Sequence, residues 1–145
     1  MVQGQAVIVS PDVTLATDGA SRGNPGPASV AYAIYRNGEG IVEEHAETIG
    51  KATNNEAEYR ALIAGLEAAA LHTGGIVHHV SDSELLVKQL EGLYSINAAN
   101  LEPLVQLVEE AARRFQGLQH THVGREDERI EHVDGLANEA LDEAE

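Results

Sequence analysis

The order of its predicted elements assigns this chain to the α/β class, with a five-stranded mixed sheet that carries helices on its faces. Two observations predict this class. Three strand-like segments follow one another near the start, joined by turns rich in Gly, Asn and Pro, and helical and strand-like segments then alternate to the end. Consecutive strands pair antiparallel, whereas strands separated by helices pair in parallel, so the two halves together predict a mixed sheet.

The strands are predicted from short runs of apolar and β-branched residues that end at turn-forming residues. One of them, Ile41–Ile49, contains three glutamates and a histidine, which indicates an exposed or edge position. Ala6–Val9 is compatible with a further short strand or with an ordered lead-in within residues 1–12. The predicted strands are Val13–Thr17, Ala28–Tyr35, Ile41–Ile49, Ile76–Val80 and Leu118–Val123.

The helices are predicted from amphipathic periodicity and from residues that cap helix ends. Thr53–Asn55 supplies N-cap chemistry for the first helix, and Pro103 is compatible with the first turn of the third. The predicted helices are Asn55–Leu71, Ser81–Gly92, Leu101–Phe115 and Val133–Ala144, with a polar loop at Gly124–Glu131 before the last.

A single domain spanning residues 1–145 is expected, because the 43% hydrophobic content can form one core. The chain has no cysteine, which excludes disulfides and thiolate metal sites. We see no secretory leader and no apolar run of about 18 residues, so no membrane span is expected. These features favour a monomeric, cytoplasmic protein.

The charge is strongly acidic. Twenty-four acidic residues against nine basic ones give a net charge of −15, which taken alone argues against a polyanionic partner. The acids are spread over every segment rather than gathered in a tail. Concentrated salt would screen their mutual repulsion, because the Debye length falls to about 3 Å at about 1 M. The composition therefore favours adaptation to high salt, as in a halophile.

Four acids lie where predicted elements begin or end, and a compact fold could bring them together around divalent metal. Three of them also have plainer explanations. Asp18 begins an Asp-Gly pair, a common hairpin-turn signal. Ser81 and Glu84 fit a capping box that would place Asp82 in the first turn of a helix. Asp134 could cap the final helix.

The fourth acid, Glu58, has to be distinguished from Glu56 on the same helix. At about 100° per residue, Glu56 falls on a polar flank of the helix, whereas Glu58 falls on the flank of Gly65 and Ala69. Those small residues allow a neighbouring element to approach closely. Glu58 is therefore the predicted inward-facing carboxylate.

The order and spacing of five segments resemble the ribonuclease H family, type 1, from about Leu15 to the C-terminus. The segments are TDGASRGNPG (Thr17–Gly26), TNNEAE (Thr53–Glu58), SDS (Ser81–Ser83), HVGRE (His122–Glu126) and VDGLAN (Val133–Asn138). The resemblance implies a ribonuclease H-like fold, with a three-stranded antiparallel meander plus parallel strands. It also implies an endoribonuclease that hydrolyses the RNA strand of RNA–DNA hybrids and leaves 3′-hydroxyl and 5′-phosphate ends.

The resemblance further implies catalysis with two divalent cations. By similarity, Asp18 would bridge both ions, Glu58 and Asp82 would complete one shell, and Asp134 the other. Two ions neutralise charge at the attacking and leaving oxygens, and carboxylate oxygens suit Mg²⁺ or Mn²⁺. Without cations, four close carboxylates would repel one another.

Substrate contacts and a helper histidine are also carried over by similarity. The residues that match hybrid-contacting positions are Gly19, Ala20, Asn24, Thr53, Asn54 and Asn55, although Asn and Thr serve equally well in turns and caps. His122 matches a mobile histidine that assists proton transfer or product release. Because its spacing to Asp134 is longer than in many relatives, His132 is the alternative for this role. The other histidines, including His78 and His79, are expected to be structural or exposed.

The sequence departs from many relatives around Leu90–Asn97, where it lacks a basic, Trp-bearing protrusion. It resembles the shorter branch found in archaea and some bacteria. Glu84 also stands where many relatives have a substrate-contacting Gln. Hybrid binding is therefore expected to be weak at low metal, and to depend on divalent ions or on a further domain.

Two other functions stay open. One is a catalytically silent module that binds RNA–DNA hybrids. The other is a related nuclease of the same superfold that acts on double-stranded RNA or on DNA.

Overall fold

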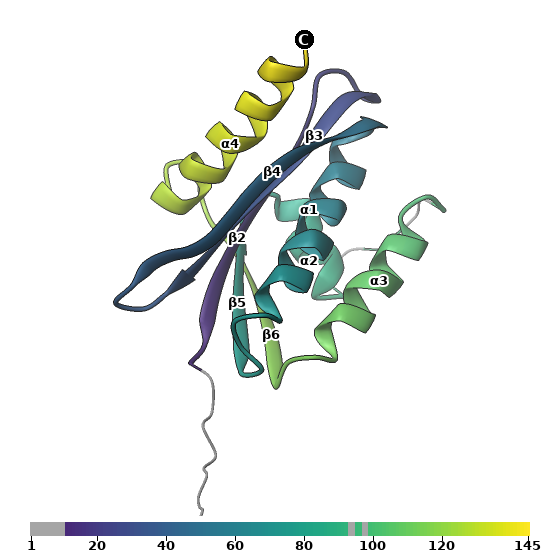
Figure 1. Ribbon diagram of the computed structural model, residues 1–145. Helices are drawn as coiled ribbons and strands as arrows, with labels where there is room; N and C mark the ends of the chain where they lie inside the picture. The colour runs from purple at the N-terminus through teal and green to yellow at the C-terminus, as the bar shows by residue number, and fades with distance from the viewer. Residues whose placement is uncertain (1–10, 93–94, 97–98) are drawn as a thin grey trace, which may run out of the picture.

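The structure, a computed structural model that describes residues 11–92, 95–96 and 99–145, contains a five-stranded sheet in the order β4-β3-β2-β5-β6 (Figure 1). The first three strands pair antiparallel, and the last two continue the sheet in parallel on the other side of β2. The predicted fold class is confirmed. The strands are β2 (Val13–Ser21), β3 (Gly26–Arg36), β4 (Gly40–Ala52), β5 (Ile76–Ser81) and β6 (Gly117–His122).

Helices cover both faces of the sheet, as predicted (Figure 1). They are α1 (Asn54–Ala69), α2 (Glu84–Leu90), α3 (Glu102–Ala112) and α4 (Glu128–Ala144). The first three lie on one face, where α1 packs on β2 and β3, and α4 lies across β2, β3 and β4 on the other. Thr53 caps α1 through a capping box with Glu56, and a proline occupies the first turn of α3, both as expected. Within the described chain, no helix is both long and apolar enough to cross a membrane.

Strand β2 is longer than predicted, and this changes the interpretation of Asp18. The strand continues from Thr17 to Ser21 because β3 keeps pairing with it as far as Ser21 opposite Ala28. Asp18 therefore lies inside the strand, opposite Ala31, with only 6% of its surface exposed. The hairpin-turn explanation of this residue is wrong.

Helix α4 begins at Glu128, five residues before the predicted start at Val133. Asp127 caps it, accepting a hydrogen bond from the Arg129 backbone N–H. The predicted polar loop is correspondingly shorter, and Asp134 lies in the second turn of the helix rather than at its cap. The capping explanation of Asp134 is therefore wrong.

Two sequence predictions fall on residues that the structure does not fully describe. The Ala6–Val9 segment and most of the 1–12 lead-in lie outside the described residues. The second prediction is the lack of a protrusion around Leu90–Asn97. Residues 93–94 and 97–98 of that segment lie outside the described residues, and the described residues between Leu90 and Glu102 form no helix.

The core has two halves, one on each face of the sheet. On the α1 side, Leu15 packs with Tyr59, Leu62 and Leu66 of α1. On the α4 side the sheet presents mainly alanine and valine to Ile130, Val133 and Ala137. Small side chains on that face let α4 lie close to the strand that carries Asp18.

Strand β4 forms one edge of the sheet, as predicted from its acids. Histidines face three of these acids from neighbouring positions. His72 contacts Glu43 at 2.8 Å, His132 of α4 contacts Glu44, and His45 lies 3.7 Å from Glu47. Glu43 and Glu44 therefore have hydrogen-bonding partners within the chain.

A buried histidine on β5 joins the two strands that flank it, β2 and β6. His79 is fully buried, and its ring nitrogens lie 2.8 Å from the Thr17 hydroxyl of β2 and 2.8 Å from His120 Nδ1 of β6. Burial lowers the pKa of His79 well below its usual value, with the neighbouring His120 as a second cause. The expected structural role of this histidine fits its position.

Candidate active site

Four elements bring the predicted acids to one cleft. Asp18 comes from β2, Glu58 from α1, Asp82 from the link between β5 and α2, and Asp134 from α4. The carboxyl ends of the parallel strands β2 and β5 meet at this edge of the sheet, which explains why residues distant in sequence converge there. The cleft has a volume of about 770 Å³, and all four acids line it.

Three of the acids are close enough to share a cation. One carboxylate oxygen each from Asp18, Glu58 and Asp82 lies within 4.8 Å of the other two. In the described residues, no other set of three histidine or acidic side chains meets this condition. Asp134 stands outside this set but beside Asp18, whose pKa it helps to raise.

The electrostatics of the cluster are unfavourable without a counter-charge. Burial, and then the charges of Asp82 and Asp134, raise the pKa of Asp18 to about 8. Burial, followed by Asp18 and Asp82, raises the pKa of Glu58 well above its usual value. A divalent cation would remove this repulsion, and oxygen donors are the ligands that Mg²⁺ and Mn²⁺ take. The donor set therefore fits such a cation.

The choice between Glu58 and Glu56 is resolved by their contacts. Glu58 faces the cleft and accepts a hydrogen bond of 3.0 Å from the Gly19 backbone N–H. Glu56 is used in the cap of α1 and accepts a further bond from Asn100. The structure places Glu58 inward, as predicted.

The structure leaves Asp82 out of helix α2. Ser83 is the N-cap, and its hydroxyl accepts from the Leu86 backbone N–H, while the Ser81 hydroxyl accepts from the Ser83 N–H. The predicted capping box of Ser81 and Glu84 is therefore wrong. Asp82 is left free to face the cleft, 3.8 Å from the Arg125 side chain.

The asparagines predicted to contact substrate also hold the β2–β3 loop against α1. Asn24 Oδ1 accepts from the Asn54 backbone N–H at 3.0 Å, and Asn54 Oδ1 accepts from the Ser21 N–H at 3.1 Å. Of the predicted substrate contacts, Gly19, Ala20 and Asn54 line the cleft, whereas Asn24, Thr53 and Asn55 do not.

Neither candidate histidine lines the cleft. His122 is exposed at the end of β6, opposite Ser81 and thus one residue away from the Asp82 position. His132 contacts Glu44 of β4. The choice between His122 and His132, which lies two residues before Asp134 in α4, therefore stays a prediction.

Arg125 and Asn138 are among the polar residues of the cleft to which sequence reasoning assigned no role. Both occur in segments that match the ribonuclease H pattern. Asn138 follows Asp134 by one helical turn, and this i, i+4 spacing is the signal that could have identified it. Arg125 has a side chain that is 93% exposed, and no local pattern predicts its approach to Asp82.

The fold and the acid cluster together define an α/β domain with a candidate divalent-metal centre. A family model described as reverse transcriptase-like matches residues 16–140. The chain is 47% identical over 127 residues to ribonuclease HI of Halobacterium salinarum, covering 88% of this chain and 63% of that protein. It is 36% identical over 133 residues to the bifunctional protein Rv2228c of Mycobacterium tuberculosis, covering 91% of this chain and 36% of that one.

Solved structures of ribonucleases H1 are similar to this fold. The crystal structure of RNase H1 from the halophilic archaeon H. salinarum has a TM-score of 0.85 at 45% identity, covering 91% of this chain and 98% of that one. LC11-RNase H1, isolated from compost and solved in complex with an RNA/DNA hybrid, has a TM-score of 0.85 at 34% identity, with the same coverage. The chain belongs to the ribonuclease H family, type 1. It spans less than two thirds of the length of both curated relatives.

Proposed function

We propose that the protein is an endoribonuclease that hydrolyses the RNA strand of RNA–DNA hybrids, leaving 3′-hydroxyl and 5′-phosphate ends. The observation that carries this proposal is the convergence of the Asp18, Glu58 and Asp82 oxygens within 4.8 Å of one another, with Asp134 beside them. The hybrid bound to the related LC11-RNase H1 supports the choice of substrate.

The four carboxylates would hold two divalent cations, Mg²⁺ or Mn²⁺. Asp18 would contact both, Glu58 and Asp82 would complete one ion's ligands, and Asp134 the other's. Bound cations neutralise charge that develops on the attacking and leaving oxygens of a phosphodiester. The chain's own contribution is to hold the ligands in place, as the Gly19 N–H does for Glu58.

Substrate recognition is proposed for the residues around the β2–β3 loop and the start of α1, namely Gly19, Ala20, Asn24, Thr53, Asn54 and Asn55. The Asn54 N–H donates to Asn24 Oδ1 and the Ser21 N–H donates to Asn54 Oδ1, and these two bonds give this surface a fixed shape. RNA differs from DNA by its 2′-hydroxyl groups, which polar groups on such a surface can contact. His122 is proposed to assist proton transfer or product release.

Two alternatives concern the same cleft. A silent hybrid-binding module would bind without cleaving, and the intact set of four acids argues against it. A related nuclease would prefer double-stranded RNA or DNA, and the recognition surface alone does not separate these duplexes from a hybrid.

A substrate panel tests the proposed function. Labelled RNA–DNA hybrid, double-stranded RNA and double-stranded DNA of one sequence are incubated with the protein over a range of Mg²⁺ and of Mn²⁺, at several salt concentrations. We expect cation-dependent cleavage of the RNA strand of the hybrid, and fragments whose 5′-phosphate a phosphatase removes. Binding without cleavage under all conditions would favour the silent module, and preferential cleavage of another duplex would replace the proposed substrate.

The acidity is proposed to be an adaptation to concentrated salt, and the resemblance to an enzyme from a halophilic archaeon supports this. We expect the melting temperature to rise strongly from about 0.1 M to about 3 M salt, because the Debye length falls from about 10 Å to about 3 Å already at about 1 M. Salt also weakens exposed ion pairs, but these contribute only about 0–1 kcal/mol each. That loss is smaller than the stability gained when salt screens the repulsion within a chain of net charge −15. Thermal unfolding followed by circular dichroism measures this, and an unchanged melting temperature would contradict it.

A further inference from the structure

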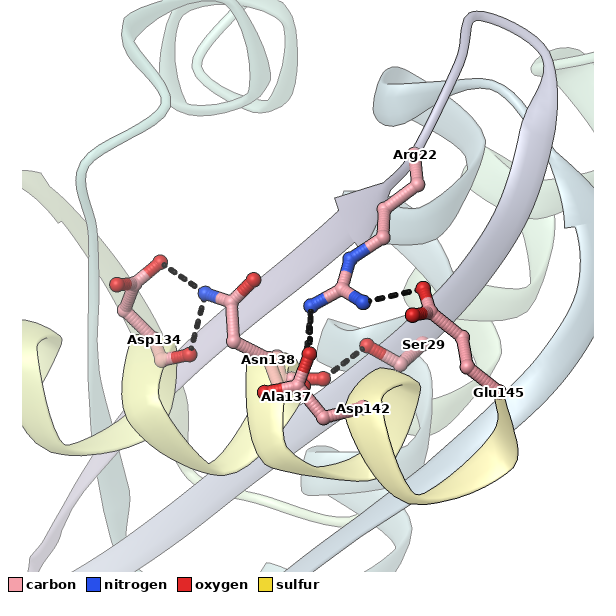
Figure 2. A network of polar contacts seen from close by, with 7 residues as sticks. All are labelled: Arg22, Ser29, Asp134, Ala137, Asn138, Asp142 and Glu145. Carbon is pink, nitrogen blue, oxygen red and sulfur yellow. Dashed lines mark hydrogen bonds and ion pairs between the residues drawn. The ribbon is translucent and has the colours of Figure 1, made fainter.

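Asn138 lies one helical turn after Asp134 on α4 and contacts it twice (Figure 2). Its side-chain Nδ2 donates to the Asp134 backbone carbonyl at 2.9 Å and to the Asp134 carboxylate Oδ1 at 3.3 Å. Asn138 is half-buried and lines the cleft of the four acids. It thus connects one of the proposed metal ligands to the backbone of its own helix.

Asp134 is the member of the cluster that most needs such a contact. It is exposed, whereas Asp18 is buried and Glu58 and Asp82 are half-buried. Glu58 is oriented by the Gly19 N–H. Asn138 provides a side-chain amide that donates to the Asp134 carboxylate.

Two further side chains fix the helix that carries both residues to the sheet (Figure 2). The buried Ser29 hydroxyl of β3 donates to the Ala137 carbonyl at 2.7 Å. Arg22, directly after β2, lies 2.6 Å from carboxylate oxygens of both Asp142 and Glu145, and also donates to the Asn138 carbonyl at 3.3 Å. Because β2 also carries Asp18, these contacts set the position of Asp134 relative to Asp18.

We propose that Asn138 is a positioning residue that holds the Asp134 carboxylate in the orientation in which it binds a divalent cation. This inference rests on the proposed function. A carboxylate that is already ordered loses less conformational freedom when a cation binds. Hydrogen-bond partners of metal ligands typically contribute about 10–100-fold in metal affinity, and we place the Asn138 amide in this group.

The test compares Asn138→Ala, Asn138→Gln and Gly135→Ala. Glutamine keeps an amide that can reach an aspartate one turn earlier. Gly135 is exposed on the same helix, and beyond its chain neighbours and the backbone of the helix an added methyl group meets no atom within 4 Å, so its replacement raises helix propensity and keeps the Asn138 amide. Binding of Mn²⁺ alone is measured by titration calorimetry in concentrated monovalent salt, with thermal unfolding in chelator as a second readout.

We expect Asn138→Ala to weaken Mn²⁺ binding about 10-fold, while Asn138→Gln and Gly135→Ala bind as the wild type does. The melting temperature of Asn138→Ala in chelator should not fall, because Ala favours a helix more than Asn. The same variant should need more cation for half-maximal cleavage, with an unchanged KM for the hybrid. Wild-type Mn²⁺ affinity in Asn138→Ala would overturn this inference alone, whereas a wild-type protein that binds no divalent cation would overturn the proposed function as well.

Discussion

Replacing Asp18 with Asn is expected to reduce hybrid cleavage by roughly 10³-fold or more while the protein remains folded. Asp18 is the acid at the centre of the cluster, since both Asp82 and Asp134 act on its pKa. Its loss would remove a shared cation ligand, and several kcal/mol of charge stabilisation correspond to a rate loss of this size. Cleavage of labelled hybrid at saturating Mg²⁺ or Mn²⁺ measures the effect.

A matched control is Glu139→Gln, which makes the same acid-to-amide change at an exposed position of α4 outside the cleft. This variant should cleave at the wild-type rate. Full activity of Asp18→Asn would contradict the assignment of the site.

Asp18→Asn should also be more stable than the wild type at high pH when chelator removes cations. The pKa of Asp18 is raised from 3.8 to about 8 in the folded protein. Its contribution to stability is therefore fully present below about pH 3.8 and is lost as the pH rises to about 8. One pKa unit corresponds to about 1.4 kcal/mol, so we expect Asn to add a few kcal/mol near pH 8 and almost nothing near pH 4. Urea unfolding at both pH values measures the difference, and equal gains at both would contradict it.

Replacing Gly19 with Ala is expected to destabilise the fold by about 3 kcal/mol or more. An added Cβ would lie 2.2 Å from the Ala57 carbonyl carbon and 2.4 Å from the Glu58 backbone nitrogen. These are backbone atoms of α1, so the contact can be relieved only if β2 and α1 move apart. Such a shift would also displace the Glu58 carboxylate, which the Gly19 N–H orients.

Urea unfolding of Gly19→Ala in chelator measures the loss, with Gly135→Ala as the control for the same chemical change. The control should gain about 0.4–1 kcal/mol, since no atom obstructs its methyl group. A stability of Gly19→Ala equal to that of the wild type would show that β2 and α1 are not in rigid contact.

The fold could be predicted because its signals are local. The meander, the alternation that follows it and the acidic edge strand each depend on residues within one segment. The small residues Gly65 and Ala69 correctly indicated that Glu58, rather than Glu56, faces inward. An added Cβ at Gly65 would lie 2.8 Å from a Leu15 side-chain atom of β2, so this flank of the helix packs closely on the sheet.

What could not be predicted depends on contacts between distant segments. Nothing near Asp18 shows that β3 continues to pair beyond it. The first turn of α4 is polar apart from Ile130, so its periodicity is weak until Val133. Arg22 and Asp142 are 120 residues apart, and no local pattern connects them. Side-chain contacts that position the acids therefore required the three-dimensional structure.

The edge strand β4 shows how the chain can resist pairing with a strand of another molecule. Glutamates along β4 repel an approaching strand, but concentrated salt weakens that repulsion. The pairing of β3 with β4 also shifts register between Ala28 and Ser29 and again between Ile34 and Tyr35. Such irregularities bend an edge away from the flat geometry that strand addition requires, at any ionic strength. Shape therefore protects the molecule from aggregation at high ionic strength, where its charge does so least.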